Sequence, residues 1–135
     1  MIELINTAVQ TVAVGQAVVY NAVAVHSGFA ERHRQGSAQV ALVRPGRYLV
    51  TFSGNIAVPT GGTVGEISLG IAQDGEVLGG SIMRVTPAAV EQYFNVSTQH
   101  YVDVYCECCI NVAVENTSDQ AILVDNPNIV VVRVC

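Results

Sequence analysis

Residues 44–58 read RPGRYLVTFSGNIAV and decide the fold class of this chain. After the turn pair Pro45-Gly46, apolar residues fall on every second position with one glycine in step, and a lighter, more polar set broken only by Leu49 occupies the others. The apolar positions are Tyr48, Val50, Phe52, Ile56 and Val58. A period of two over this length is typical of a long β-strand with one face in a core. The stretch therefore predicts a strand in an all-β protein.

The composition of the whole chain also favours strands. Of the 135 residues, 25 are Val, 50% are apolar and only 6% are aromatic. Val is stiff at χ1 and packs well on a pleated surface. Only 13% of the residues are charged, the net charge is −5 and all six basic residues are Arg. The small fraction of charged residues, together with the high apolar fraction, predicts self-association. The lack of clustered Lys and Arg argues against nucleic acid as a partner.

Turn signals divide the chain into short strands within one expected domain, residues 1–135. The strongest hairpin signal is Asp74-Gly75, which joins two alternating runs. Three polar or Pro/Gly-containing stretches are expected to be surface loops. They are His26–Ser37, Pro59–Gly65 and Thr86–Gln92. The expected strands cover residues 5–14, 17–25, 38–43, 46–58, 66–73, 77–85, 92–105, 110–115 and 122–134.

Eight to ten short strands leave no room for crossover helices between them. The expected fold is an all-β, antiparallel two-sheet jelly-roll sandwich. An immunoglobulin-type sandwich is the alternative. It is less favoured because the chain has no Trp and no Cys pair spaced to join two sheets.

Three segments resemble one known family. Arg44–Phe52 looks like the P-G-x-Y-x-x-x-F strand of the tumour necrosis factor and complement globular-head jelly rolls. Ile110–Ser118 resembles the x-V-x-V-x-N-x-S strand and turn of their bacterial and phage relatives, and Asn128–Val134 is similar to the final strand of that group. The resemblance spans about Val12 to Val134.

This resemblance implies a non-enzymatic homotrimer that acts as a head or knob domain in recognition. Such heads occur on phage fibres, on spore surfaces and in secreted signalling proteins. We therefore expect a phage or prophage fibre or capsid-decoration head, or a spore-surface protein. Its partner would be a glycan or protein of the host surface, bound through loops at one end of the barrel.

The residue pattern also favours a trimer. If Tyr48 and Phe52 face the core, Leu49 points to the opposite face of the strand and needs its own cover. Near the end of the chain, the consecutive valines 130–132 cannot all face one side. A neighbouring subunit would cover the second face. The residues expected at the trimer interface are Tyr48, Leu49, Phe52, Val130 and Val132.

The N-terminus does not resemble a signal peptide. Met1-Ile2-Glu3-Leu4 has neither a basic start nor an apolar run of the required length. No segment has the eighteen or so apolar residues of a membrane helix. We expect synthesis in the cytoplasm without membrane insertion, and a final location on a virion or on a bacterial or spore surface.

Four cysteines are the best candidates for special chemistry. Cys106, Cys108 and Cys109 fall in one short window and Cys135 ends the chain. Thiolates at close spacing bind borderline metals, and His100 or His26 is a candidate further ligand. However, Cys-x-Cys-Cys is not the spacing of a zinc knuckle. The expectation is reduced, structural thiols without a disulfide inside the window, and no cofactor.

No catalytic constellation stands out. The chain lacks a Gly-x-Ser-x-Gly elbow, and His26, His33 and His100 are scattered rather than paired as in cupin-type metal sites. Asp119 and Asp125 have Asn neighbours that would suit calcium, but Asp and Asn are also what turns require. A small jelly-roll metal-dependent enzyme or a carbohydrate-binding protein is the alternative interpretation.

Overall fold

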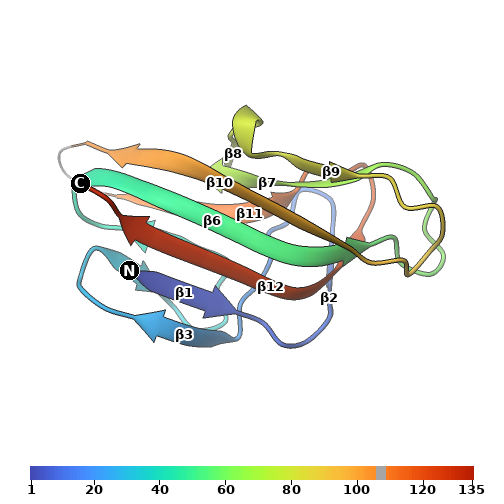
Figure 1. The fold of residues 1–135 in the computed structure, drawn as a ribbon, viewed down its shortest axis with the longest axis horizontal. Coiled ribbons are helices and arrows are strands. Elements are labelled where there is room, and N and C mark those ends of the chain that lie inside the picture. The colour runs from blue at the N-terminus through green and yellow to red at the C-terminus, as the bar shows by residue number, and fades with distance from the viewer. Residues whose placement is uncertain (106–108) are drawn as a thin grey trace.

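The computed structural model describes residues 1–105 and 109–135 as two antiparallel sheets packed face to face (Figure 1). Sheet A has the order β10-β6-β12-β1-β3, with β2 also paired to β12. Its strands are β1 (Ile2–Ile5), β2 (Gln10–Val12), β3 (Ala22–His26), β6 (Gly46–Ala57), β10 (Phe94–Val104) and β12 (Ile122–Arg133). The two-sheet antiparallel sandwich predicted from the sequence is confirmed.

Sheet B has the order β4-β5-β11-β7-β8, with β9 also paired to β7. Its strands are β4 (Glu31–His33), β5 (Val40–Leu42), β7 (Ile67–Gln73), β8 (Glu76–Val77), β9 (Met83–Val85) and β11 (Ile110–Asn116), and a single 3-10 turn, η1 (Gly79–Ser81), follows β8. The described residues thus form twelve strands instead of eight to ten, because several expected runs are split into segments of two to four residues.

The core lies between the sheets and is built by alternation. Tyr48, Val50 and Phe52 point inward from β6 and have no exposed surface. Gly54 continues the inward set because a Cβ there would lie 3.3 Å from both the Phe52 ring and the Cα of Pro127. Pro127 belongs to a bulge in β12, between its two paired segments. The glycine therefore allows β6 and the bulged strand to approach closely.

The hairpin signal at Asp74-Gly75 is confirmed. Both residues have positive φ, 51° and 86°, as a type I′ turn requires, and Gln73 pairs with Glu76 across it. After this hairpin the chain runs back along the edge of β7, where β8 and β9 both pair with it. Ser81 donates from its hydroxyl to the carbonyl of Leu78 at 2.6 Å and accepts from the amide of Ile71 at 2.9 Å. Both edges of β7 are therefore paired, and six of its seven residues are buried.

The stretch His26–Ser37, expected to be a loop, contains a strand. Glu31–His33 forms β4, which pairs with β5 at the edge of sheet B. Its polar sequence suggested a solvated loop, but the Glu31 side chain is directed inward, where it has no exposed surface. In the described residues, no helix is long and apolar enough to span a membrane.

Candidate subunit interface

The outer face of sheet A carries an apolar patch at one end. Leu49 on β6 lies between Tyr101 on β10 and Val132 on β12 in the strand register. In the next outward row, Val130 on β12 lies opposite Thr51. Tyr101 is 58% exposed, and the three aliphatic side chains are partly exposed. We call Leu49, Tyr101, Val130 and Val132 the Leu49 patch.

The structure corrects two of the five expected interface residues. Tyr48 and Phe52 have no exposed surface, because both point between the sheets of a single chain. They are core residues and offer nothing to a neighbouring subunit. Leu49, Val130 and Val132 do lie on the outward face, as their alternation with the core residues requires. Their contact with another subunit remains a prediction.

The other end of the same face is polar. Here Ser53 pairs with Ser97 and Asn55 with Asn95, and the Asn95 amide donates to the Asn55 side-chain oxygen at 3.2 Å. On the other side of β6, the Asn128 amide donates to the carboxylate of Glu3 at 2.6 Å. The outer face of sheet A is therefore divided into an apolar half and a hydrogen-bonding half.

An ion pair borders the Leu49 patch. The guanidinium of Arg47 donates to both carboxylate oxygens of Asp103, at 2.7 and 3.2 Å, and lies 5.9 Å from the centroid of the Tyr101 ring. The hydrogen bond from Arg47 lowers the pKa of Asp103 below its ordinary value. Sequence reasoning missed these three residues, although Tyr101 and Asp103 alternate with inward-facing valines on β10.

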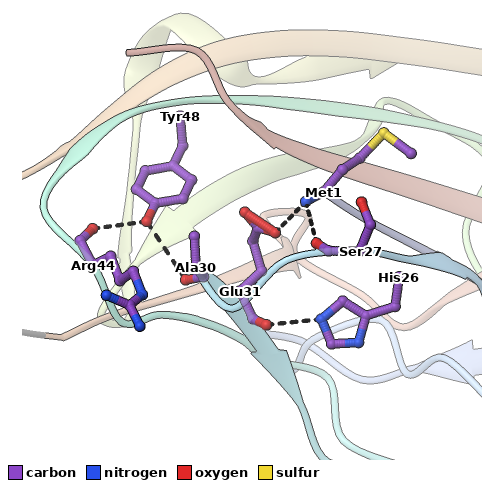
Figure 2. A network of polar contacts seen from close by, with 7 residues as sticks. All are labelled: Met1, His26, Ser27, Ala30, Glu31, Arg44 and Tyr48. Atoms are coloured by element: carbon purple, nitrogen blue, oxygen red, sulfur yellow. Dashed lines mark hydrogen bonds and ion pairs between the residues drawn. The ribbon is translucent and has the colours of Figure 1, made fainter.

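A polar network lies next to the first half of β6 (Figure 2). The Met1 amine donates to the fully buried carboxylate of Glu31 at 2.5 Å and to the Ser27 carbonyl at 2.8 Å. The Tyr48 hydroxyl donates to the carbonyl of Arg44 at 2.7 Å. It also lies 3.5 Å from the carbonyl oxygen of residue 30. These contacts hold the segment between β3 and β5 against the end of the sandwich.

The three candidate binding loops were expected at one end of the barrel, but the structure places them at two opposite ends. Pro59–Gly65 and Thr86–Gln92 lie together at the end of β6, where the amide of Glu91 donates to the carbonyl of Val58 at 2.7 Å. His26–Ser37 begins at the opposite end of β6, beside the network of Figure 2. β6 has twelve residues, so the length of the sandwich separates the two groups.

The predicted metal ligands are not assembled in the described residues. Cys109 is disulfide-bonded, which contradicts the expected reduced thiol and removes the thiolate that a metal would need. Cys106 and Cys108 lie outside the described residues. His100 has Nδ1 2.7 Å from the Tyr101 carbonyl oxygen and its ring beside Gly80. Within residues 1–105 and 109–135, no three His, Cys, Asp or Glu side chains form a group that could hold a metal ion.

Solved structures match nearly the whole chain at low sequence identity. The Eiger TNF from S. frugiperda has a TM-score of 0.74 and 10% identity over 100% of this chain and 92% of its own. The globular domain of the zebrafish complement 1qA protein has a TM-score of 0.67 and 12% identity over 96% and 94% of the two chains. The PRD1 vertex protein P5 has a TM-score of 0.53 and 15% identity over 99% and 96%.

These similarities show that the fold is a jelly roll of the TNF and C1q type, as the sequence motifs predicted. No protein-family model matches the sequence, and no curated protein does.

Proposed function

We propose that the chain forms a homotrimer through the outer face of sheet A and acts as a non-enzymatic recognition head. The observation that carries this proposal is the Leu49 patch. Six of the seven β7 residues in sheet B are buried within a single chain, whereas the Leu49 patch has a tyrosine ring 58% exposed beside three partly exposed aliphatic side chains. Two copies of the same surface supply an apolar cover that one chain lacks.

The fold supports this assembly. TNF- and C1q-like fold families usually form homotrimers, and their domains are typically non-enzymatic recognition modules. The division of the face into an apolar half and a hydrogen-bonding half also suits a subunit interface, because a buried apolar centre needs polar contacts to fix the relative orientation of the subunits.

The proposed location is the surface of a virion or of a bacterial cell or spore. A head on a phage or prophage fibre, or a capsid decoration, would bind a glycan or protein of the host surface. Support comes from the fold shared with a protein named as a vertex protein. A rigid jelly roll with loops at both ends is suited to presenting such contacts.

Sedimentation equilibrium at micromolar concentration tests the assembly. The expected mass is three times the 14.3 kDa of the chain. A measured mass of one chain at every concentration would refute the proposed homotrimer. Elemental analysis of the same sample distinguishes the alternative, since a stoichiometric metal in a monomer or dimer would indicate a metal-dependent jelly-roll protein.

Mass spectrometry of purified virions and spores from the producing strain tests the location. Recovery of the chain in one of these particles is expected. Its confinement to the soluble lysate fraction would contradict a surface role.

A further inference from the structure

The outer face of sheet B has a groove built on one cross-strand row. Arg32 on β4 lies opposite Ala41 on β5, and Ala41 lies opposite Asn111 on β11. The small Ala41 side chain lies between two longer ones, so the surface is hollow at this point. The groove has a volume of about 440 Å³. Its described lining, here called the Arg32 groove, is Arg32, His33, Arg34, Ser37, Gln39, Ala41 and Asn111.

The groove is positively charged on a protein whose net charge is −5. Arg32 and Arg34 have no carboxylate partner among the described residues, unlike Arg47 and Arg84. The acidic residue next to them in sequence, Glu31, is turned inward and paired with the N-terminal amine. No described residue lining the groove is acidic. Two guanidinium groups therefore remain available to an external anion.

The neutral lining residues supply hydrogen-bonding groups. The Ser37 hydroxyl accepts from the amide of Gln39 at 3.0 Å, which leaves its own proton available to a ligand. The amide of Ser37 donates to the Arg34 carbonyl at 2.9 Å and closes the turn that holds Arg34 beside the groove. The side-chain amides of Gln39 and Asn111 each offer donors and an acceptor.

A second hollow adjoins the groove through Arg32. It has a volume of about 480 Å³, and its described lining residues are Phe29, Arg32, Val43, Arg44, Pro45 and Cys109. Phe29 is 77% exposed. The Arg44 backbone is fixed by the hydrogen bond from Tyr48 shown in Figure 2. A ligand anchored at Arg32 can therefore extend toward a third guanidinium and an apolar ring.

We propose that the Arg32 groove binds an acidic sugar whose carboxylate or sulfate group pairs with Arg32 and Arg34. Its hydroxyl groups would exchange hydrogen bonds with Ser37, Gln39 and Asn111. Sugar hydroxyls both donate and accept, as these three side chains do. An acidic peptide is less suited to the groove itself, because Ala41 is the one apolar residue in its described lining, and the apolar side chains lie only in the adjoining hollow.

This inference names the ligand class of the recognition head. Binding at one groove does not depend on the proposed trimer, and only the simultaneous binding of three grooves rests on it. The groove lies on the outer face of sheet B, and the Leu49 patch lies on the outer face of sheet A. A trimer built through sheet A would leave three grooves open. Three weak sites on one rigid particle bind a glycan-coated surface much more tightly than one site does.

Isothermal titration calorimetry with dextran sulfate, polysialic acid and neutral dextran tests the groove. Dextran sulfate or polysialic acid should bind at physiological salt, and neutral dextran should not. The two anionic polymers distinguish a sulfate ligand from a carboxylate ligand. A double variant, Arg32→Gln with Arg34→Gln, should lose roughly tenfold or more in affinity, because charge-assisted hydrogen bonds are lost.

Each single variant, Arg32→Gln and Arg34→Gln, has Arg84→Gln as its matched control, which removes one guanidinium from β9, where Arg84 lies 3.8 Å from Glu66. The control should bind as the unmodified protein does. An equal loss in the control, no binding of either polymer, or tighter binding of polyglutamate would each overturn the proposal. Sedimentation of the same samples separates the two proposals: a trimer without binding refutes only the groove, and a monomer that binds refutes only the trimer.

Discussion

Leu49 and Val132 lie directly opposite each other on the outer face of sheet A, one strand apart. Both alternate with fully buried neighbours, Tyr48 and Val50 on β6 and Val131 on β12. Two apolar side chains on the solvent side of adjacent strands form a cross-strand pair that stabilises a sheet only modestly by itself. Their larger contribution is expected when another subunit removes them from water.

Replacing Leu49 with Asp should convert the trimer to monomers without unfolding the chain, because the charge would be buried only in the assembly. Sedimentation equilibrium measures the mass, and circular dichroism checks the fold. Val14→Asp is the control, since Val14 is 53% exposed in the loop after β2. A trimer that persists in Leu49→Asp would contradict the proposed interface.

Loss of the hydroxyl should change the free energy of unfolding differently at two buried tyrosines. Tyr48→Phe removes the 2.7 Å hydrogen bond to the Arg44 carbonyl and should lower the free energy of unfolding by about 1 kcal/mol. The Tyr20 hydroxyl is buried with no hydrogen-bond partner in the described residues, so Tyr20→Phe should be neutral or stabilise by up to about 1 kcal/mol. Urea denaturation measures both. Equal destabilisation by the two variants would be inconsistent with this difference in hydrogen bonding.

The turn between β7 and β8 should be sensitive to a methyl group because of its backbone conformation. Gly75 has a φ of 86°, and a Cβ added there would meet no atom within 4 Å. Gly75→Ala should therefore destabilise the protein by about 1 kcal/mol through backbone strain alone. A Cβ at Gly79 would also meet no atom within 4 Å, but Gly79 does not have a positive φ. Gly79→Ala should therefore change stability by less than about 0.5 kcal/mol. Thermal unfolding of the two variants compares them, and a similar loss in both would exclude strain as the cause.

The Arg47–Asp103 pair should give a measurable pH dependence. Its hydrogen bond lowers the pKa of Asp103 in the folded protein, so the pair stabilises the fold above the unfolded-state pKa. That stabilisation is lost as the pH falls through the lower, folded-state pKa. Carboxyl NMR titration should show a higher pKa for Asp103 in Arg47→Gln than in the unmodified protein. An unchanged pKa would mean that the pair does not persist in solution.

Much of the fold could be predicted because its signals are local. The alternation along β6 and the positive-φ turn at Asp74-Gly75 depend on residues that are neighbours in sequence. The subdivision of residues 77–85 was not predictable, because it depends on Ser81 reaching back to β7. Likewise, the burial of Glu31 could not be predicted from its polar neighbours, because it depends on pairing with the amine of Met1, which is distant in sequence.

The candidate sites were less predictable than the fold for the same reason. Leu49 was recognisable as an outward residue, but its neighbours Tyr101 and Val132 are set by strand order, which the sequence does not state. Tyr48 and Phe52 are predicted at the interface but lie in the core, because large apolar side chains on a strand suit a subunit contact as well as a core. The Arg32 groove depends on Asn111, which is distant in sequence and reaches β5 only through the pairing of β11.

The two chain ends lie at the same end of the sandwich, as Figure 1 shows, and the Cys135 carbonyl accepts from the amide of Arg47 at the start of β6. A short engineered peptide could therefore link residue 135 to residue 1, with new ends opened in the distant turn at Gly61-Gly62. The strand pairings of both sheets do not involve the linked ends, and cargo fused to the permutant would project from the opposite pole of the molecule. The link would turn the Met1 amine into an amide, so Glu31→Gln would have to accompany it to avoid an unpaired buried carboxylate.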